Sequence, residues 1–291
     1  MGDKTRSLLL TFYALALAAA ATSCMSAPTP STTPAPGGAG GLSQAQLDAQ
    51  EAAAHPSAPY DPNDASTWPP VATFSIIAYD SASGMWGGAV QSRVFSVGNG
   101  VLWAEAGVGI VATQAVVDVS YGPQALELLR AGVPAPEVVK IVWDRDPNPD
   151  TVNWNKTGRQ FAVVDAQGRV GVYTGPTATT WAGHKTGKSV TAQGNILAGP
   201  GVVDSMVAAY EATAGQHMAF RLMAALDAGQ KAGGDRRGMQ SANMIIVKKN
   251  AGIWLHNDVI TRLQVDDSPQ PLVEMRRLLE VQQRMGRLRT P

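Results

Sequence analysis

The stretch TFSIIAYDSASGMWGGAVQSRVFSVGNGVLWAEAGVGIVATQ, residues 73–114, decides the fold of this chain. It begins with Thr73 and a β-type run to residue 79, and the turn-forming letters DSASG separate this run from a second one over residues 85–91. A third apolar run, residues 108–113, comes after two glycine-rich loops. The pattern predicts a hairpin of inner strands with a hydroxyl residue, Thr73, at the head of the first strand.

A threonine in this place can be a nucleophile. Its hydroxyl needs a base, and the α-amine of Thr73 becomes that base only when the peptide bond before it is cut. Because 72 residues precede Thr73, the uncut chain has an amide nitrogen there. The alternative is that Thr73 only begins a strand, which β-branched residues favour. Ser75, two residues along the same strand, is a weaker candidate because no base is assigned to it.

Length and composition limit the class of protein. The chain has 291 residues, and once a leader and spacer are set aside, roughly 220 remain, which fits one large domain. A 45% hydrophobic and 16% charged composition supports a substantial core. A net charge of zero and the lack of a basic motif argue against nucleic-acid binding. The lone cysteine, Cys24, excludes an intrachain disulfide, and histidine spacing predicts no metal; no cofactor is expected.

Residues 1–24 are typical of an export signal. Lys4 and Arg6 precede an apolar run over residues 8–21, and small residues lead into Cys24. The cysteine resembles that of a bacterial lipobox, where cleavage precedes a lipidated cysteine, although Ala21 replaces the usual leucine. We therefore expect an exported cell-envelope protein anchored to a bacterial membrane through Cys24. An ordinary secretory peptide is the alternative.

Residues 25–72 differ in composition from the rest. They hold nine of the 19 prolines, among Ser, Thr, Ala and Gly. Such a segment buries too little apolar surface to offset its chain entropy, so it is interpreted as a tether between membrane and domain.

Helical and strand patterns alternate through the remaining chain. Proline and glycine punctuation and apolar spacing predict helices at 121–131, 134–142, 200–210, 216–228 and 272–288. Alternation and β-branched content predict strands at 160–164, 169–174, 189–193, 241–248 and 253–256. This order suits two sheets stacked between helical layers. The basic amphipathic helix within residues 273–291 is expected to dock on the domain or a second subunit rather than on anionic lipid.

The ordered motifs resemble one known family. TFSIIAYD, GGAVQSR, WAEAGVGIVATQ, SYGP, VVDAQGRV, WAGHKTG, QGNILAG and GGDRRGMQSA are similar to the bacterial family called domain of unknown function 1028, over residues 73–272. The resemblance implies an α+β fold, a four-layer αββα sandwich like that of the N-terminal-nucleophile (Ntn) hydrolases. It also implies Thr73 as catalytic nucleophile, freed by autoproteolysis or by a peptidase acting after Ala72, and an assembly into homo-oligomers.

Seven further residues are candidates for substrate binding in the same cleft: Arg93, Glu105, Gln114, Asn195, Asp235, Arg237 and Gln240. Arg93 ends the second strand. Its guanidinium could bind a substrate carboxylate through two hydrogen bonds, or it could form an ion pair with Glu105 or Asp80. Asn195 could donate to an oxyanion or only cap a turn.

The GGDRRGMQ loop carries a similar ambiguity. Its adjacent arginines could bind an anion, or Asp235 could pair with one of them and lock the loop. Under the first reading, Arg237→Ala removes ligand binding and leaves the melting temperature nearly unchanged.

Two functions from different classes follow. The first is an amidohydrolase acting on a small amide or peptide-like compound, with Thr73 as nucleophile. The second is a non-catalytic cell-envelope lipoprotein that binds its ligand through Arg93, Asn195 and the loop over residues 235–240. A third hypothesis is that the domain is a purely structural module of an assembly. An uncut chain would exclude the amine-assisted chemistry.

Overall fold

The computed structural model of the chain describes residues 73–288. The predicted signal peptide, Cys24 and the predicted tether over residues 25–72 lie outside the described residues, as do residues 289–291. Within the described part, no helix has both the length and the apolar character needed to cross a bilayer.

The first two strands form the hairpin that the opening sequence predicts. β1 (Thr73–Asp80) pairs antiparallel with β2 (Met85–Ser92) along its whole length. The backbone N–H of Gly84 closes the turn on the carbonyl of Asp80 at 2.8 Å. Gly84 has a φ of 68°, which glycine adopts without steric cost.

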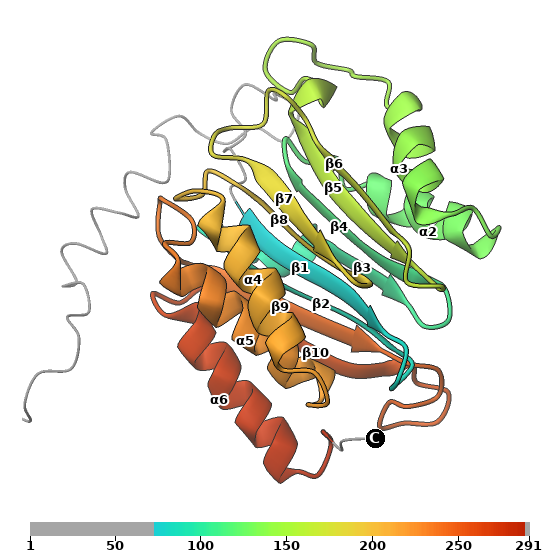
Figure 1. Ribbon diagram of the computed structural model, residues 1–291, viewed down its shortest axis with the longest axis vertical. Coiled ribbons are helices and arrows are strands. Elements are labelled where there is room, and N and C mark those ends of the chain that lie inside the picture. The colour runs from blue at the N-terminus through green and yellow to red at the C-terminus, as the bar shows by residue number, and fades with distance from the viewer. Residues whose placement is uncertain (1–72, 289–291) are drawn as a thin grey trace, which may run out of the picture. The chain divides into compact units, whose positions relative to one another are not determined.

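This hairpin lies in the middle of a six-stranded antiparallel sheet with the order β10-β9-β2-β1-β8-β7 (Figure 1). The four other strands are β7 (Gly183–Gly187), β8 (Val190–Asn195), β9 (Ser241–Val247) and β10 (Val259–Val265). Strands distant in sequence therefore meet at β1 and β2, which are flanked by β8 and β9.

A second antiparallel sheet has the order β3-β4-β5-β6. Its strands are β3 (Leu102–Glu105), β4 (Gly109–Ala115), β5 (Arg159–Asp165) and β6 (Val170–Thr174). β4 and β5 are buried along their whole length, as their apolar runs predict.

Side-chain alternation along β1 shows how the layers form. Phe74, Ile76 and Ala78 belong to a core beneath helices, whereas Ile77 and Tyr79 belong to the core between the two sheets. Since successive strand side chains point to opposite faces, one strand contributes to two cores. Thr73 and Ser75 therefore lie on the face toward the other sheet.

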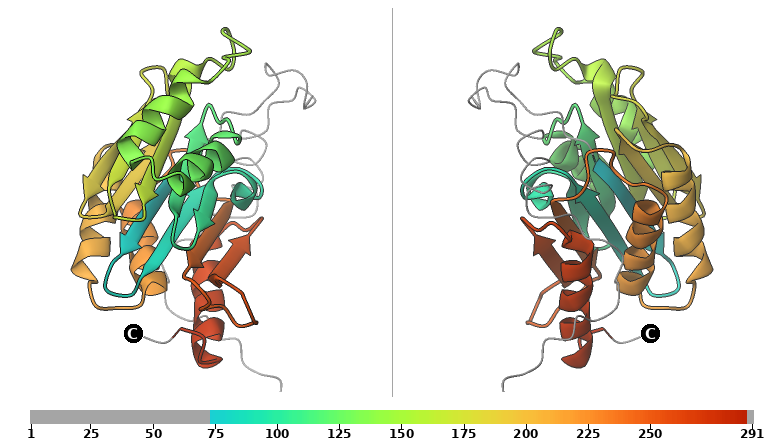
Figure 2. Two further views of the ribbon diagram at one scale, coloured as in Figure 1. Left: turned by 90° about the vertical axis from the view of Figure 1, so that its right-hand side faces the viewer. Right: turned by 90° about the vertical axis from the view of Figure 1, so that its left-hand side faces the viewer.

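Five helices cover the outer faces of the sheets (Figures 1 and 2). The face of the six-stranded sheet carries α4 (Gly201–Ala212), α5 (Met218–Lys231) and α6 (Pro271–Arg284). The four-stranded sheet carries α2 (Tyr121–Arg130) and α3 (Ala135–Asp144). α6 buries Leu272, Met275 and Leu279, one helical stripe, so it docks on the domain as expected.

The glycines of the GGAVQSR motif allow close packing on both faces of β2. A Cβ on Gly87 would lie 2.3 Å from Met218 Sδ of α5, and one on Gly88 would lie 2.9 Å from Ile77 Cγ2. Neither position can hold a side chain unless its neighbours move, so these glycines set the spacing of the layers.

The predicted mixed α+β architecture is confirmed, and both sheets are antiparallel. The short strands β3 and β7 and the edge strand β10 were not predicted. Residues 253–256, predicted as a strand, lie instead in the loop before β10, with His256 at a φ of 60°. Two exposed hydrophilic residues, Arg262 and Gln264, break up the apolar run of β10, which is an edge strand.

Candidate functional site

One end of the six-stranded sheet carries a row of four buried polar residues. Thr73 of β1 lies opposite Ser92 of β2 and Asn195 of β8, and Ser92 also lies opposite Ser241 of β9. Each is at most 1% exposed. By strand alternation all four lie on the face toward the other sheet, at the end of an otherwise apolar core. Such a row has to be satisfied by hydrogen bonds or by a ligand.

Thr73 is fully buried and loosely held. Its Oγ1 donates to Ser92 Oγ at 3.3 Å, which is long for a hydrogen bond between hydroxyls, and its carbonyl accepts from Gln114 Nε2 at 3.5 Å. The described hydrogen bonds of Thr73 involve no carboxylate and no imidazole.

Ser75, the second hydroxyl on this face of β1, is tightly bound. Its Oγ donates to Gln114 Oε1 at 2.6 Å and accepts from Gln193 Nε2 at 2.6 Å. A hydroxyl whose proton is given to an amide carbonyl has no base to activate it. Ser75 is therefore a structural link between the sheets.

Gln114 and Gln160 extend this link into the second sheet. The two residues face each other on β4 and β5. Gln160 Oε1 accepts from Gln114 Nε2 at 2.8 Å and from Asn195 Nδ2 at 3.2 Å, while its amide donates to the Gly194 carbonyl at 2.9 Å. Four buried amides, those of Gln114, Gln160, Gln193 and Asn195, thus surround the head of β1.

The amide cluster has a route toward the surface. Gln160 Nε2 also donates to Thr174 Oγ1 at 3.0 Å, and that hydroxyl lies 2.9 Å from Nδ1 of His184. His184 is exposed on β7. The edge strand β7 brings it to the rim of the polar cluster.

The backbone is strained directly after two of the amides. Ala115, which follows Gln114, has a φ of 65°, and Ile196, which follows Asn195, has a φ of 52°. A left-handed conformation is costly for a β-branched residue such as isoleucine and is often found at functional sites. Both turns redirect the chain at the end of the sheet where Thr73 lies.

A buried ion pair anchors the start of β5 beside this cluster. Arg159 Nε donates to Asp146 Oδ2 at 2.9 Å, and the Tyr121 hydroxyl donates to the same oxygen at 2.6 Å. Burial raises the pKa of the Asp146 carboxyl. The hydrogen bonds from Tyr121, Arg159 and the Asn148 backbone outweigh it, so the pKa lies below its ordinary value.

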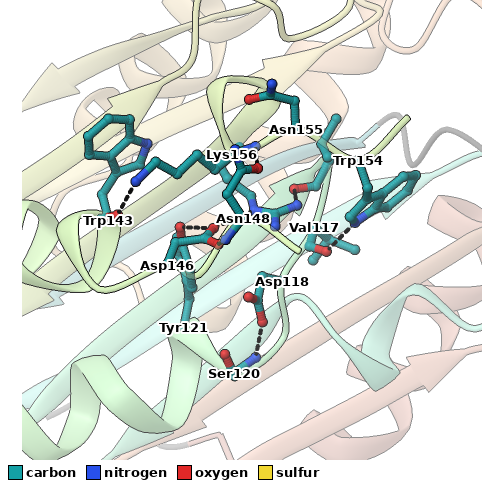
Figure 3. Close-up of polar contacts among 12 residues, drawn as sticks. Val117, Asp118, Ser120, Tyr121, Trp143, Asp146, Asn148, Trp154, Asn155 and Lys156 are labelled. Atoms are coloured by element: carbon teal, nitrogen blue, oxygen red, sulfur yellow. Dashed lines mark hydrogen bonds and ion pairs between the residues drawn. The ribbon is translucent and has the colours of Figure 1, made fainter. Parts of the chain in front are cut away.

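Further contacts hold the segment between α3 and β5 (Figure 3). Asn148 Oδ1 accepts from the Lys156 backbone at 2.7 Å, the Lys156 ammonium lies 4.1 Å from the Trp143 ring centre, and Trp154 Nε1 donates to the Val117 carbonyl at 2.9 Å. These contacts position Arg159, and through the strand they position its neighbour Gln160.

The GGDRRGMQ loop lies at the same end of the six-stranded sheet. Asp235 Oδ2 accepts from the Arg93 backbone at 3.3 Å, and Leu197, two residues after Asn195, pairs with Asp235 in an isolated bridge. The backbone N–H of Gln240 donates to the Ser92 carbonyl at 3.0 Å. The structure therefore brings Arg93, Asp235 and Gln240 next to the polar row.

Inside the loop, Asp235 is paired. Its carboxylate is buried and accepts from Arg237 NH2 at 2.9 Å and from the Arg237 backbone at 2.9 Å. The pairing of Asp235 with Arg237 holds the loop in place, as in the second of the two alternatives, in which an ion pair and not an anionic ligand occupies the arginine. Arg236, the neighbouring arginine, is exposed.

Three polar atoms around this loop are buried without a hydrogen-bond partner in the described protein: Gln91 Oε1, Arg93 Nε and Gln240 Oε1. The Arg93 guanidinium also donates from NH1 to the Met239 carbonyl at 3.2 Å. Buried unsatisfied groups are rare in folded proteins and are satisfied by water, ions or ligands. They mark this loop as the place where a polar ligand could be held.

Glu105 is not part of this group. It ends β3 opposite Gly109, at the other end of β4 from Gln114, and forms a partly exposed ion pair with Arg130 at 2.8 Å. The alternative pairings of Arg93 do not occur either, since Glu105 pairs with Arg130 and Asp80 lies 3.7 Å from Arg221. Over residues 73–288, no group of His, Cys, Asp or Glu is placed to hold a metal ion.

Sequence reasoning missed Gln160, Ser92 and Ser241. The sequence feature that could have identified them is their position at the ends of predicted strands. Gln160 begins an apolar strand run, and Ser92 and Ser241 lie at the end and the start of theirs, as Thr73 and Asn195 do. A polar residue at the same end of several buried strands predicts a common cluster once the pairing is known.

Comparison with known proteins gives a family and a related structure. The profile of DUF1028, a family of unknown function, matches residues 73–275. Seven solved chains match. Among them is a crystal structure of a Silicibacter pomeroyi protein of the DUF1028 family, with 28% sequence identity and a TM-score of 0.64, covering 72% of this chain and 86% of that one. No curated protein matches.

Proposed function

The chain belongs to the DUF1028 family, and from this premise we propose that it is an exported amide hydrolase of the Ntn type. Its nucleophile is Thr73, active once the peptide bond after Ala72 has been cut. The substrate is a small amide or peptide-like compound of the cell envelope. The kinship with Ntn hydrolases and the lipid anchor at Cys24 are parts of this proposal.

One observation carries the proposal. Thr73 Oγ1 lies among neutral hydroxyls and amides, and its hydrogen bond goes to Ser92 Oγ. In such a cluster, the new α-amine of Thr73 is the base nearest to the hydroxyl. An α-amine has an ordinary pKa of about 7.7–8.0, so a useful fraction is neutral near pH 7.

The reaction then follows the ordinary course of acyl transfer. Thr73 Oγ1 bonds to the substrate carbonyl carbon and its proton passes to the Thr73 amine. The carbonyl oxygen becomes an oxyanion, and the side-chain amide of Asn195, which lies opposite Thr73 on β8, donates a hydrogen bond to it. The C–N bond breaks as the ammonium returns a proton to the leaving amine.

A threonyl ester remains on the enzyme after this step. Water attacks it, the amine takes a proton from the water, and the acid product leaves as Thr73 Oγ1 is protonated again. Gln160 is a positioning residue, because it orients Gln114 and Asn195 through its Oε1.

A second candidate function has an observation in its favour. The unpaired buried atoms Arg93 Nε, Gln91 Oε1 and Gln240 Oε1 provide a donor and two acceptors around the loop over residues 235–240. They suit a non-catalytic envelope protein that holds a polar ligand there. In the hydrolase they would bind the part of the substrate remote from the scissile amide.

An electrophilic probe tests the proposal. A β-lactone acylates an activated threonine hydroxyl, and peptide mass spectrometry locates the adduct. We expect an adduct on Thr73 in protein whose chain starts at Thr73, its loss in Thr73→Ala, and its retention in Ser75→Ala. Folded protein starting at Thr73 that gains no adduct there would favour the ligand-binding function.

A further inference from the structure

Far from the polar row, the loop between β9 and β10 exposes large apolar side chains. Trp254 is 73% and Leu255 is 87% exposed, and Ile253 and Met285 are also exposed. The register of β9 and β10 puts this loop at the opposite end of the sheet from Ser241, because Val247 pairs with Val259. Contiguous exposed apolar residues of this size mark interaction surfaces.

The loop is ordered by its own hydrogen bonds. The N–H of Gly252 donates to the Asn257 carbonyl at 2.7 Å, and the N–H of Asn257 donates to the Trp254 carbonyl at 3.0 Å. Asp258 accepts from the backbone of Asn250 at 2.8 Å and from the Lys249 ammonium at 3.0 Å. This framework presents Trp254 and Leu255 to solvent as a fixed tip.

An apolar groove adjoins the tip. It has a volume of about 520 Å³, lies between the loop, β10 and α6, and is lined by apolar residues that include Ile260, Leu263, Leu278 and Val281. Arg262 and Arg287 line the same groove. A guanidinium beside an apolar channel suits an amphiphile with an anionic head and a hydrocarbon tail.

Charge around the tip is positive in a chain whose net charge is zero. Four cations, Lys249, Arg262, Arg284 and Arg287, lie on the loop, on β10 and at the end of α6, against the two carboxylates Asp258 and Glu280. Tryptophan and leucine at a tip ringed by basic residues are the features of surfaces that bind anionic membranes.

We propose that this surface, named here the 253–255 tip, binds anionic phospholipid bilayers. Trp254 and Leu255 enter the headgroup boundary, Arg262 and Arg287 contact lipid phosphates, and the groove takes part of an acyl chain. The site is distinct from the cluster at Thr73 and does not depend on the proposed hydrolase activity. It would fix the orientation of the domain on a membrane surface, with the Thr73 end of the sheet directed away from the lipid.

Quenching of tryptophan fluorescence by brominated lipid tests this proposal on the full chain. The signal depends on how deeply a tryptophan enters the bilayer, and not only on whether the protein is bound to the vesicle. The chain is mixed with vesicles of phosphatidylcholine containing about 30% brominated phosphatidylglycerol, a fraction chosen to give a strong anionic surface. We expect quenching that falls at least threefold in Trp254→Phe. Since phenylalanine keeps the tip apolar, Trp254→Phe still sediments with the vesicles.

Matched variants separate the contributions. Leu255→Ser with Ile253→Ser, and Arg262→Gln with Arg287→Gln, should each reduce the Trp254 quenching. Val273→Ser and Arg277→Gln, exposed on the first turns of α6, should leave it unchanged. Quenching should also be weak on vesicles in which all lipid, brominated lipid included, is phosphatidylcholine.

Two results would overturn the proposal. One is equal quenching of wild type and Trp254→Phe on the anionic vesicles. The other is a concentration-dependent dimer in ultracentrifugation that Leu255→Ser abolishes while vesicles leave Trp254 unquenched, since the tip would then bind a second copy of the chain.

Discussion

Ser75 Oγ donates to Gln114 Oε1 at 2.6 Å, across the space between the two sheets. This contact joins β1 of one sheet to β4 of the other at a polar end of a layer otherwise filled mainly with apolar side chains. It also distinguishes the two hydroxyl side chains that β1 directs toward the other sheet, those of Thr73 and Ser75. Ser75 links the two sheets, and Thr73 is the hydroxyl to which we assign the proposed chemistry.

Gln160 should be important for stability. In Gln160→Leu, the N–H groups of Gln114 and Asn195 lose their common acceptor inside the protein. We expect a loss of about 2–4 kcal/mol in the free energy of unfolding, measured by urea denaturation. Gln216→Leu, at an exposed position, should change it by less than about 0.5 kcal/mol. Equal effects of the two would show that the amide cluster is satisfied by water.

Asp146 should make stability depend on acid pH. Its pKa is lowered in the folded protein, so the folded state favours the carboxylate. The stabilisation is full above the ordinary pKa of about 3.9 and is lost as pH falls through the folded pKa. Asp146→Asn should therefore show a shallower fall in unfolding free energy below pH 4 than wild type.

At pH 7 the same variant should be less stable by about 3 kcal/mol, because the buried Arg159 charge loses its partner. Asp144→Asn is the control, since Asp144 forms an exposed pair with Lys140. An Asp146→Asn protein as stable as Asp144→Asn would contradict a structural role for the ion pair.

His217 predicts a second pH effect, in a higher range. Nδ1 of His217 caps α5 by accepting from the Ala219 N–H at 3.2 Å, and burial lowers the pKa of this imidazole. The folded state therefore favours the neutral ring. Its stabilisation is full above the ordinary pKa of about 6.5 and is lost as pH falls from there through the folded pKa.

Melting temperature against pH checks this. His217→Asn keeps a capping oxygen and should reduce the step that begins below about pH 6.5, while His256→Gln, at an exposed position, should keep it. A step of equal size in all three proteins would assign the effect to other groups.

Arg237 and Arg236 make a matched pair. Arg237→Ala leaves the buried Asp235 carboxylate without its charged partner and should cost about 2 kcal/mol of unfolding free energy. Arg236→Ala, at an exposed position, should cost less than about 0.5 kcal/mol. A nearly unchanged melting temperature in Arg237→Ala would instead support the hypothesis that Arg237 binds a ligand and does not stabilise the loop.

The sequence predicted the long elements well, because β1, β2, β4 and the five helices carry strong apolar periods and clear proline and glycine boundaries. It failed at the sheet edges. β7 and β10 bury few side chains, and exposed residues such as His184 and Arg262 leave them without a continuous apolar run. The 253–255 tip was predicted as part of a strand because its residues are apolar. In the structure these side chains are exposed and do not face a core.

Part of the candidate site could also be predicted. Thr73, Gln114 and Asn195 were proposed and lie together. Gln160 and Ser241 could not be added, because their proximity depends on which strands pair, and pairing is set by packing between distant segments. Glu105 was grouped with them because its apolar neighbours and the following glycine loop suggested partial burial, but β4 carries the chain to the other end of the sheet between Glu105 and Gln114.

N-terminal sequencing with intact-mass measurement shows whether the α-amine of Thr73 is freed. The full chain is expressed in a bacterial host with its own leader, beside Thr73→Ala. The account predicts a fragment that begins at Thr73 in the wild-type protein, with the mass of residues 73–291. A folded, mature protein in which the bond between Ala72 and Thr73 stays intact would contradict it, since Thr73 would then have a hydroxyl but no base.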